Sequence, residues 1–292
     1  MRTWILAFPT LLPLILPSPL VAETPAVKVE NVRRVYDNGE HNAFTDLIRW
    51  RGRFWLTFRS CPDGHSVNSS SSIRVLASDD AQSWDEVHRF SVARRDTRDP
   101  HFLAFGDRLF IYTGTWWSGD GALPREKYNL NQHLGYAVFT SDGESWSEPR
   151  VLEGTYGHYI WRAAEHEGKA YLCGRRKLNY SEEDGGAGAS RVVQSAMLES
   201  EDGLVWKFHS LFQENRGDET AFLFEEDGSL LAVSRSGGQP AQLVRAEKPW
   251  IEKMRKDFPD YIGGPLLALG RSLPGRRTSE YQGRTEDRAI LA

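Results

Sequence analysis

The amino-acid sequence predicts an all-β fold, a β-propeller made of four-stranded antiparallel blades. Three observations predict it: a turn motif that recurs at near-equal spacing, a hairpin pattern in phase with that motif, and a composition suited to short strands. The 292 residues contain 12% aromatic residues, ten tryptophans and 26 glycines. That mix is typical of many short strands joined by tight turns.

The turn motif has the pattern Ser/Thr-x-Asp-Gly/Ala-x-x-Trp, and it occurs at Ser78–Trp84, Thr140–Trp146 and Ser200–Trp206. The three copies start 62 and 60 residues apart, and such a period indicates a repeat architecture. The hydroxyl and carboxylate bond to the backbone of the turn, and the tryptophan packs the hairpin down. We therefore expect a structural role for the three aspartates of the motif, Asp80, Asp142 and Asp202.

Apolar segments that break at a turn glycine form the second repeat. Each predicts a strand, a turn and a second strand. The five segments are Leu47–Phe58 around Gly52, Phe102–Tyr112 around Gly106, Ala163–Cys173 around Gly168, Ala221–Val233 around Gly228 and Pro265–Pro274 around Gly270. Together with the turn motif they define a four-stranded unit of roughly 50 to 60 residues, the blade of a propeller. The expected blades cover residues 41–90, 98–153, 159–213, 218–250 and 262–292.

Three segments lie outside this repeat. Val27–Val35 reads as an isolated strand that closes the ring by pairing with the last blade, and Trp250–Phe258 reads as a helix-like insertion. The fifth unit supplies one hairpin and the strand Arg288–Ala292. The ring then either has five blades with a thin last one, or is part of a six-bladed ring. The second alternative is slightly favoured, because an open propeller would leave an unpaired edge strand.

Residues 1–22 have the order of a secretory signal peptide: a basic start, an apolar run and a small-residue end at Leu20-Val21-Ala22. A membrane anchor is the alternative, but the four prolines of this run make a poor transmembrane helix. No later stretch is apolar enough to cross a bilayer. We expect an exported protein, secreted or periplasmic, with the propeller over residues 23–292.

Charge and cysteine content exclude several classes of protein. The net charge is −4 and the pI is about 6.1, so the chain lacks the basic footprint of a nucleic-acid-binding protein. The two cysteines, Cys61 and Cys173, exclude a disulfide framework. They fall at equivalent points of two blades, and we expect two unpaired buried thiols. No cluster has zinc-site spacing, and neither a metal nor a cofactor is expected.

Arginines recur at the ends of the second strands. The residues seven positions after the turn glycines are Arg59, Thr113, Arg175, Arg235 and Arg277. In a propeller these strand ends meet at one mouth of the channel, where guanidinium groups would bind a carboxylate, sulfate or phosphate. The alternative is that each arginine pairs with a carboxylate of the neighbouring blade and joins the two blades.

The starts of the first strands should face the same mouth. They supply His41, Arg98, Asp99, Trp161 and Glu219. Carboxylates beside arginines and a histidine are the groups needed for acid–base chemistry on a glycosidic bond, and Trp161 offers an apolar platform for a sugar. Simpler alternatives remain open: Asp99 as a turn residue, Glu219 as a structural carboxylate and His41 as an ordinary polar contact.

The turn motifs, the segment Glu219–Arg235 and the tripeptide Arg98-Asp99-Pro100 resemble the sialidase (neuraminidase) superfamily, whose propellers carry the turn motif as the Asp-box, or bacterial neuraminidase repeat. The resemblance covers about residues 41–270. It implies a six-bladed ring and an exo-α-sialidase type of glycoside hydrolase. In such enzymes three arginines clamp the substrate carboxylate, a glutamate activates a tyrosine nucleophile, and an aspartate is the acid/base.

Carried onto this chain, the resemblance places Glu219 as the activating glutamate, Arg235 and Arg277 as clamp arginines, and Asp63, in the loop after Arg59, as the acid/base. The sequence departs from the family in two places. The residues His41 to Phe44 stand where a Phe-Arg-Ile-Pro motif would carry the first clamp arginine, and the last blade that normally supplies the tyrosine is missing.

Two functions follow as expectations. The first is an exported exo-glycosidase acting on an anionic glycan or glycoconjugate, and the second is a non-catalytic glycan-binding propeller. Two carboxyl groups about 5–10 Å apart in the funnel would favour hydrolysis. An arginine ring that ties up every carboxylate would favour binding.

Overall fold

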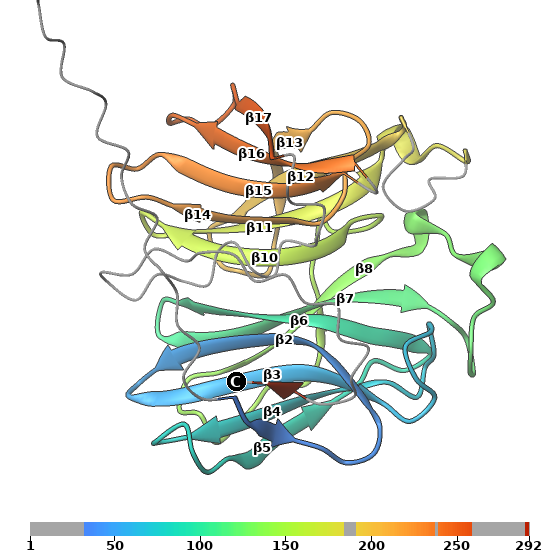
Figure 1. Cartoon of the computed structure of the whole chain (residues 1–292), viewed down its shortest axis with the longest axis vertical. Coiled ribbons are helices and arrows are strands. Elements are labelled where there is room, and N and C mark those ends of the chain that lie inside the picture. Colours follow the sequence, from blue (N-terminus) through green and yellow to red (C-terminus); the bar gives the residue numbers. More distant parts are fainter. Residues whose placement is uncertain (1–31, 184–190, 237–238, 259–289, 292) are drawn as a thin grey trace, which may run out of the picture.

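The computed structural model describes residues 32–183, 191–236, 239–258 and 290–291. These residues form four antiparallel sheets of four strands each and one two-stranded pair. In every four-stranded sheet the strands pair in chain order (Figure 1). The predicted all-β propeller of four-stranded blades is confirmed, and the described residues contain four blades.

Blades 1 and 2 are formed by the first half of the chain. Blade 1 consists of β2 (His41–Trp50), β3 (Arg53–Cys61), β4 (Ser72–Ser78) and β5 (Asp85–Phe90). Blade 2 consists of β6 (Arg95–Phe105), β7 (Arg108–Trp117), β8 (Leu134–Thr140) and β9 (Arg150–Val151). The connection from β7 to β8 contains two short 3-10 helices, η1 (Arg125–Lys127) and η2 (Leu130–Gln132).

Blades 3 and 4 repeat the plan. Blade 3 consists of β10 (Tyr159–His166), β11 (Lys169–Lys177), β12 (Val193–Ser200) and β13 (Lys207–Gln213), with the 3-10 helix η3 (Leu178–Tyr180) after β11. Blade 4 consists of β14 (Thr220–Phe224), β15 (Leu230–Ser236), β16 (Gln239–Ala246) and β17 (Met254–Phe258). The remaining pair joins β1 (Arg34–Tyr36) to β18 (Ile290–Leu291).

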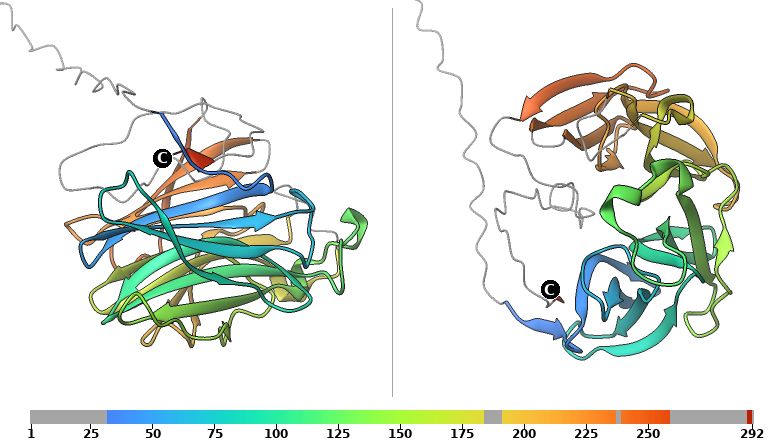
Figure 2. Two further views of the ribbon diagram at one scale, coloured as in Figure 1. Left: turned by 90° about the horizontal axis from the view of Figure 1, so that it is seen from below. Right: turned by 90° about the vertical axis from the view of Figure 1, so that its right-hand side faces the viewer.

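The first strand of each blade lies innermost. β2 contacts β6, β6 contacts β10, and β10 contacts β14, and the four blades follow one another along a curved path (Figure 2). The pairing of β2, β6 and β10 with their second strands shifts register near the start of the strand. The shift leaves Phe44, Asp99 and Trp161 at equivalent unpaired positions. Phe44 and Asp99 adopt left-handed backbone conformations there, with φ of 62° and 53°.

The core lies between the blades. Trp55 and Val75 of blade 1 pack with Ile111 and Val138 of blade 2 in one buried cluster. A second cluster joins blades 2 and 3, and a third joins blades 3 and 4. Each blade therefore buries one face against the next, as the apolar alternation of short strands requires.

The three repeated turns have the same local structure. Asp142 Oδ1 accepts hydrogen bonds from the backbone N–H groups of Glu144 and Ser145, both at 2.8 Å. Asp80 and Asp202 each accept the two corresponding bonds. The three aspartates therefore have the expected structural role, because each one bonds the backbone of its own turn.

The tryptophans of these turns pack inward, but not equally. Trp206 is buried against Tyr112 of the preceding blade, with ring centroids 5.6 Å apart, whereas Trp84 and Trp146 are half-buried. Gly203 explains the close fit: an added Cβ would lie 2.8 Å from the Tyr112 hydroxyl, and its φ is +77°. Gly143 meets Trp55 of blade 1 at the same distance.

Several expectations need correction. Trp250–Phe258 is not a helical insertion, because β17 pairs with β16 as the outer strand of blade 4. A six-bladed ring with five visible blades was expected, and the described residues form four blades. The expected fifth blade, 262–292, lies outside the described residues except for β18. The isolated strand expected at Val27–Val35 is seen at Arg34–Tyr36, paired with β18. The proposed signal peptide, 1–22, also lies outside the described residues.

Cys61 and Cys173 are both buried and unpaired, as expected. Within the described part of the chain, no helix has the length and apolar character needed to cross a membrane.

Candidate functional site

Arg59 joins blades 1 and 2 and is not accessible to a ligand. Its side chain has 0% exposure, and its Nε donates to Asp96 Oδ1 at 2.9 Å. The two terminal nitrogens donate to the carbonyl oxygens of Gly64 and Ser66, both at 3.0 Å. Every polar face of this guanidinium is thus used within the protein. The substrate-binding role expected for Arg59 is replaced by the alternative, a contact that joins two blades.

Arg98 contacts the carboxylate of Asp96, as Arg59 does. Its Nη2 donates to Asp96 Oδ2 and, at 3.2 Å, to the carbonyl oxygen of His65, while its Nε is buried without a hydrogen-bond partner. Burial acts to raise the pKa of Asp96, but Arg98 and Arg59 together hold it below its usual value. Asp96 is therefore an ionised anchor that orients Arg98.

Arg175 and Asp218 repeat this contact between blades 3 and 4. Arg175 Nη1 donates to Asp218 Oδ1 at 2.9 Å, and the Asp218 side chain has no exposed surface. The guanidinium lies over the ring of Tyr159, 5.4 Å from its centroid. Arg235 Nε approaches the other oxygen of Asp218 at 3.6 Å. In both junctions an arginine at the end of a second strand meets an aspartate at the start of the next blade.

Glu219 lies beside this junction. It accepts a hydrogen bond from Arg235 Nη1 at 3.2 Å. Burial is the largest influence on its pKa, and the charge of Asp218 adds to it. The opposing charges of Arg175 and Arg235 do not compensate fully, and the pKa of Glu219 is raised.

Asp99 is the least compensated carboxyl group of the cluster. Its residue is 2% exposed, and Oδ1 is buried without a hydrogen-bond partner. Burial raises the pKa of Asp99 to about 7; Arg98 opposes the shift, and the charges of Glu219 and Asp96 add to it. Asp99 lines neither of the two cavities beside this junction, and its carboxyl group is enclosed by the protein. The positive φ of Asp99 is a strain of the kind that concentrates at functional sites.

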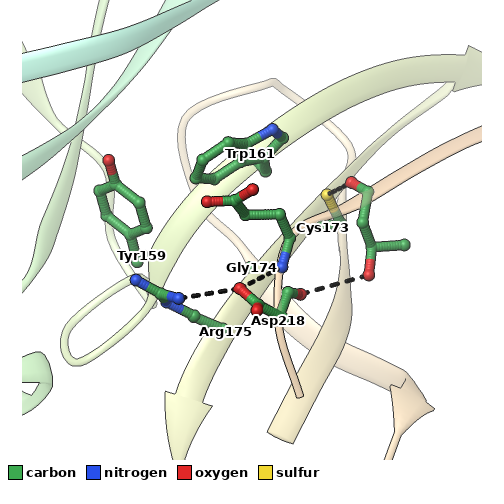
Figure 3. A pocket seen from close by; sticks show the side chains of 8 residues that line it. Tyr159, Trp161, Cys173, Gly174, Arg175 and Asp218 are labelled. Atoms are coloured by element: carbon green, nitrogen blue, oxygen red, sulfur yellow. Dashed lines mark hydrogen bonds and ion pairs between the residues drawn. The ribbon is translucent and has the colours of Figure 1, made fainter. Parts of the chain in front are cut away.

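A narrow crevice separates the aromatic rings of blade 3 from the carboxylates of blade 4. It holds about 150 Å³ of space between atoms, too little for a sugar. Trp161 lies in its wall, with its ring 5.3 Å from that of Tyr159. Figure 3 shows Tyr159 and Trp161 on one side and the Arg175–Asp218 pair on the other. The lining residues are Tyr159, Trp161, Cys173, Gly174, Arg175, Asp218, Glu219 and Thr220.

A much larger cleft opens next to it and shares Arg175 with it. The cleft has a volume of about 1080 Å³ and is formed largely by the β7–β8 connection. It contains five cationic side chains, two carboxylates and the aromatic rings of Trp116 and Tyr128. The cationic residues are Arg98, Arg125, Lys127, Arg175 and Lys177.

His41 and His65 stand near the rim of this cleft. His65 Nδ1 lies 3.3 Å from His41 Nε2, and His65 lines the cleft. Burial lowers the pKa of His41 to about 4, with further lowering by His65 and Arg59. The pKa of His65 is also lowered, first by burial and then by Arg98. Both rings are therefore neutral at pH 7 and act as hydrogen-bonding groups.

Two expected site residues are not brought to this cluster. Asp63 lies in an exposed loop, where Oδ2 accepts a hydrogen bond from Ser70 Oγ at 2.6 Å, and it lines neither the crevice nor the cleft. Because the Asp63 carboxylate is exposed and bonded to Ser70, the structure gives no support to Asp63 as the acid/base. Arg277 lies outside the described residues.

The sequence reasoning missed His133, which no pattern singled out. It is fully buried between Trp116 and Tyr159, with ring centroids 4.0 Å and 4.5 Å away. Burial, then Arg175, Arg95 and Arg98, lower its pKa well below the usual value. A neutral ring here supports the wall that carries Tyr159 without adding charge.

Below the mouth, Asp46 joins three inner strands. Its Oδ1 accepts from Arg162 Nη1 at 2.5 Å, its Oδ2 accepts from the backbone N–H of Phe102 at 2.8 Å, and His101 Nδ1 lies 3.7 Å away. Burial acts to raise the pKa of Asp46, but Arg162 and His101 lower it far below its usual value. In the described ranges, no group of three or more His, Cys, Asp or Glu side chains is placed to hold a metal ion.

No family model matches the chain, and no curated protein matches it. Its fold is similar to those of many solved structures at low identity, and three of them illustrate the range. A Dyadobacter fermentans protein of unknown function has a TM-score of 0.61 and 18% identity, over 78% of this chain and 74% of that one. Zg3597, a family 117 glycoside hydrolase from Zobellia galactanivorans, has a TM-score of 0.54 and 14% identity, over 77% and 74%. Trypanosoma rangeli sialidase in complex with the inhibitor DANA has a TM-score of 0.56 and 16% identity, over 74% and 38%. At such identities the likeness establishes the propeller fold.

Proposed function

We propose that this chain is an exported glycan-active propeller that hydrolyses a glycosidic bond of an anionic sugar, with Asp99 and Glu219 as the catalytic carboxyl groups. The observation that carries the proposal is Asp99, whose residue is 2% exposed and whose Oδ1 is buried without a hydrogen-bond partner, next to Arg98 in the chain. Burial raises the pKa of this carboxyl group to about 7. The leader-like residues 1–22 support export. Two of the three similar solved structures are glycoside hydrolases by name, which supports the reaction class.

The two carboxyl groups suit different roles. A general acid works best when its pKa lies near the operating pH and its proton is present before the reaction. Asp99 meets this condition and would protonate the leaving oxygen as the glycosidic bond breaks. Glu219 is held closer to the ionised state by Arg175 and Arg235, and it would accept the proton of the attacking group. Both pKa values are raised, and the division of roles rests on the two arginines that oppose the shift at Glu219.

Arg98 and Arg175 supply the anion-binding surface. Both line the large cleft, and each donates on one side to a buried aspartate. A guanidinium oriented in this way loses little freedom on binding a carboxylate or sulfate. The exo-α-sialidase type remains part of this proposal, on the resemblance of the Asp-box turns and of Glu219–Arg235.

A non-catalytic glycan-binding propeller is the second candidate. It is favoured by the ion pairs of the mouth, since Asp96, Asp218 and Glu219 all contact arginines. Asp99 differs from these three carboxylates because its Oδ1 is buried without a hydrogen-bond partner. The choice between the two functions therefore depends on Asp99.

Hydrolysis of aryl glycosides of sialic acid and of uronic acids tests the proposal. Glu219→Gln and Asp99→Asn should each lower kcat at least about a hundredfold, the lower range for loss of general acid–base catalysis. Asp63→Asn separates Asp99 from the acid/base that the resemblance implies, and should leave kcat within about twofold. Asp85→Asn, on the outer strand β5, is the matched control.

Two results would contradict the enzymatic role. One is an unchanged rate in a folded Glu219→Gln protein. The other is the absence of turnover by the wild type together with measurable binding of an acidic sugar, which would identify a binding module.

A further inference from the structure

Lys177 is a buried cation that the proposed chemistry leaves unused. It ends β11, is 8% exposed and lines the large cleft. Among the described residues, its ammonium has neither a carboxylate nor a hydrogen-bond partner. The Nζ atom is not among the buried nitrogens that lack a partner, so the ammonium keeps its contact with solvent in the cleft. A ligand anion in the cleft would supply the missing partner.

The position of Lys177 separates it from the first anion site. Arg175 lies two residues earlier on the same strand, so both side chains emerge on the same face of β11, about 6–7 Å apart along the strand. Arg175 is fixed by Asp218, whereas Lys177 carries its charge further along the cleft. The strand therefore presents two successive cationic positions, one paired and one free.

The charge and the size of the cleft also favour a ligand with more than one anionic group. Arg125 and Lys127, at the ends of η1, add two more cations, and Glu126 and Glu182 are the only acidic side chains among the described residues that line it. This positive lining occurs in a chain of net charge −4. The volume of about 1080 Å³ is at the upper end of ligand pockets, which are roughly 300–1,000 Å³. Such a cleft has room for more than one sugar.

We propose that Lys177, with Arg125 and Lys127 of the same cleft, forms a second anion subsite, and that the ligand is an acidic oligosaccharide with anionic groups on at least two of its sugars. The inference rests on the proposed function, because the first anionic group is the one held at Arg98 and Arg175. A carboxylate or a sulfate ester would satisfy the same ammonium.

Binding measured by calorimetry at fixed, low salt tests the inference. The probes are galacturonic acid, its disaccharide, a disaccharide with a sulfate on each sugar, and a neutral disaccharide. The wild type should bind one of the acidic disaccharides at least about tenfold more tightly than the monosaccharide, because the second anionic group gains a hydrogen bond to a charged partner. The disaccharide that shows the gain identifies carboxylate or sulfate as the recognised group.

Lys177→Met should remove that gain and leave the affinity for the monosaccharide within about twofold, while Lys177→Arg should keep most of it. Lys207→Met, on the outer strand β13, is the matched control, and thermal unfolding confirms that each variant is folded. If Lys177→Met weakens the monosaccharide and disaccharides equally, or if the wild type shows no gain, the second subsite is wrong and the proposed function stands. If the wild type binds no acidic sugar at all, both fail.

Discussion

Asp96 and Asp99 lie three residues apart on β6, both buried, yet their surroundings act on them in opposite directions. Asp96 accepts hydrogen bonds from Arg59, Arg98 and the backbone N–H of Asn68, and its pKa is lowered. Asp99 has an unpartnered oxygen and a pKa raised to about 7. The same chemical group thus serves as an anchor at one position and as a candidate acid at the other. The number and geometry of donors decide which.

The contrast extends over the whole mouth. Asp46, like Asp96, is an ionised carboxylate that joins blades, through Arg162 of blade 3. These two paired carboxylates differ from Asp99 and Glu219, whose pKa values are both raised. A protein that tolerates two incompletely compensated carboxyl groups there carries a cost in stability that function can explain.

Replacing Asp96 by alanine should give the largest effect. Arg59 would remain fully buried without its carboxylate, and breaking a buried ion pair typically costs about 3–5 kcal/mol. Urea unfolding at pH 7 measures this loss. Asp63→Ala, in an exposed loop, should change the free energy of unfolding by no more than about 0.5 kcal/mol. A loss below about 1 kcal/mol for Asp96→Ala would show that Asp96 is not the anchor that its contacts indicate.

Replacing Asp99 by asparagine should have the opposite effect on stability. The folded-state pKa of Asp99 is about 7 and the ordinary value is 3.8, so between these values the folded state keeps a proton that the unfolded state releases. Wild-type stability therefore falls as the pH rises from about 4 to 7. Relative to the wild type, Asp99→Asn should gain roughly 2–4 kcal/mol between pH 4.5 and pH 8.

The check is the difference in unfolding free energy between Asp99→Asn and the wild type at the two pH values. An equal difference at pH 4.5 and pH 8 would mean that Asp99 titrates normally. Asp99 would then be a structural carboxylate like Asp96 and not a candidate acid.

The blades could be predicted from the sequence because their signals are local. Asp142 bonds the backbone two and three residues ahead of it, so the turn carries its own hydrogen bonds and is visible in a short motif. The prediction of a helix-like insertion at Trp250–Phe258 was wrong because the strand there depends on pairing with another strand and not on a local signal. β17 exists because Leu243 and Val244 of β16 pair with Lys256 and Arg255, and such pairing overrides local preference.

The spacing of the arginines predicted that Arg59, Arg175 and Arg235 lie near the ends of second strands. It did not predict which arginine joins two blades and which one reaches a cavity. Arg59 and Arg175 occupy the same place in their blades. Arg59 is covered because the loop after β3 brings the carbonyls of Gly64 and Ser66 onto it, whereas Arg175 is left at the cleft. Long-range packing makes this distinction, and neither the motif nor its spacing contains it. Asp99 could be identified as a candidate from its place at a strand start, but its raised pKa depends on burial.

Arg235→Met should give the smallest change in stability. It also tests whether Arg235 is a structural contact between blades or a residue that acts on Glu219. Arg235 is 35% exposed and contacts both Asp218, at 3.6 Å, and Glu219, at 3.2 Å. Asp218 keeps its contact with Arg175 at 2.9 Å, so the loss at low pH should be at most about 1 kcal/mol, as for partly exposed ion pairs. Glu219, however, loses a charge that lowers its pKa.

The pKa of Glu219 should therefore rise further in Arg235→Met. A group with a raised folded-state pKa loses stability as the pH rises, so the variant should fall further below the wild type at pH 8 than at pH 4.5. If the chain hydrolyses an acidic glycoside, the acid limb of its kcat/KM profile should move to higher pH, because Glu219 must ionise to act as a base. A loss as large as that of Asp96→Ala, equal at both pH values, would instead place Arg235 among the contacts that join the blades.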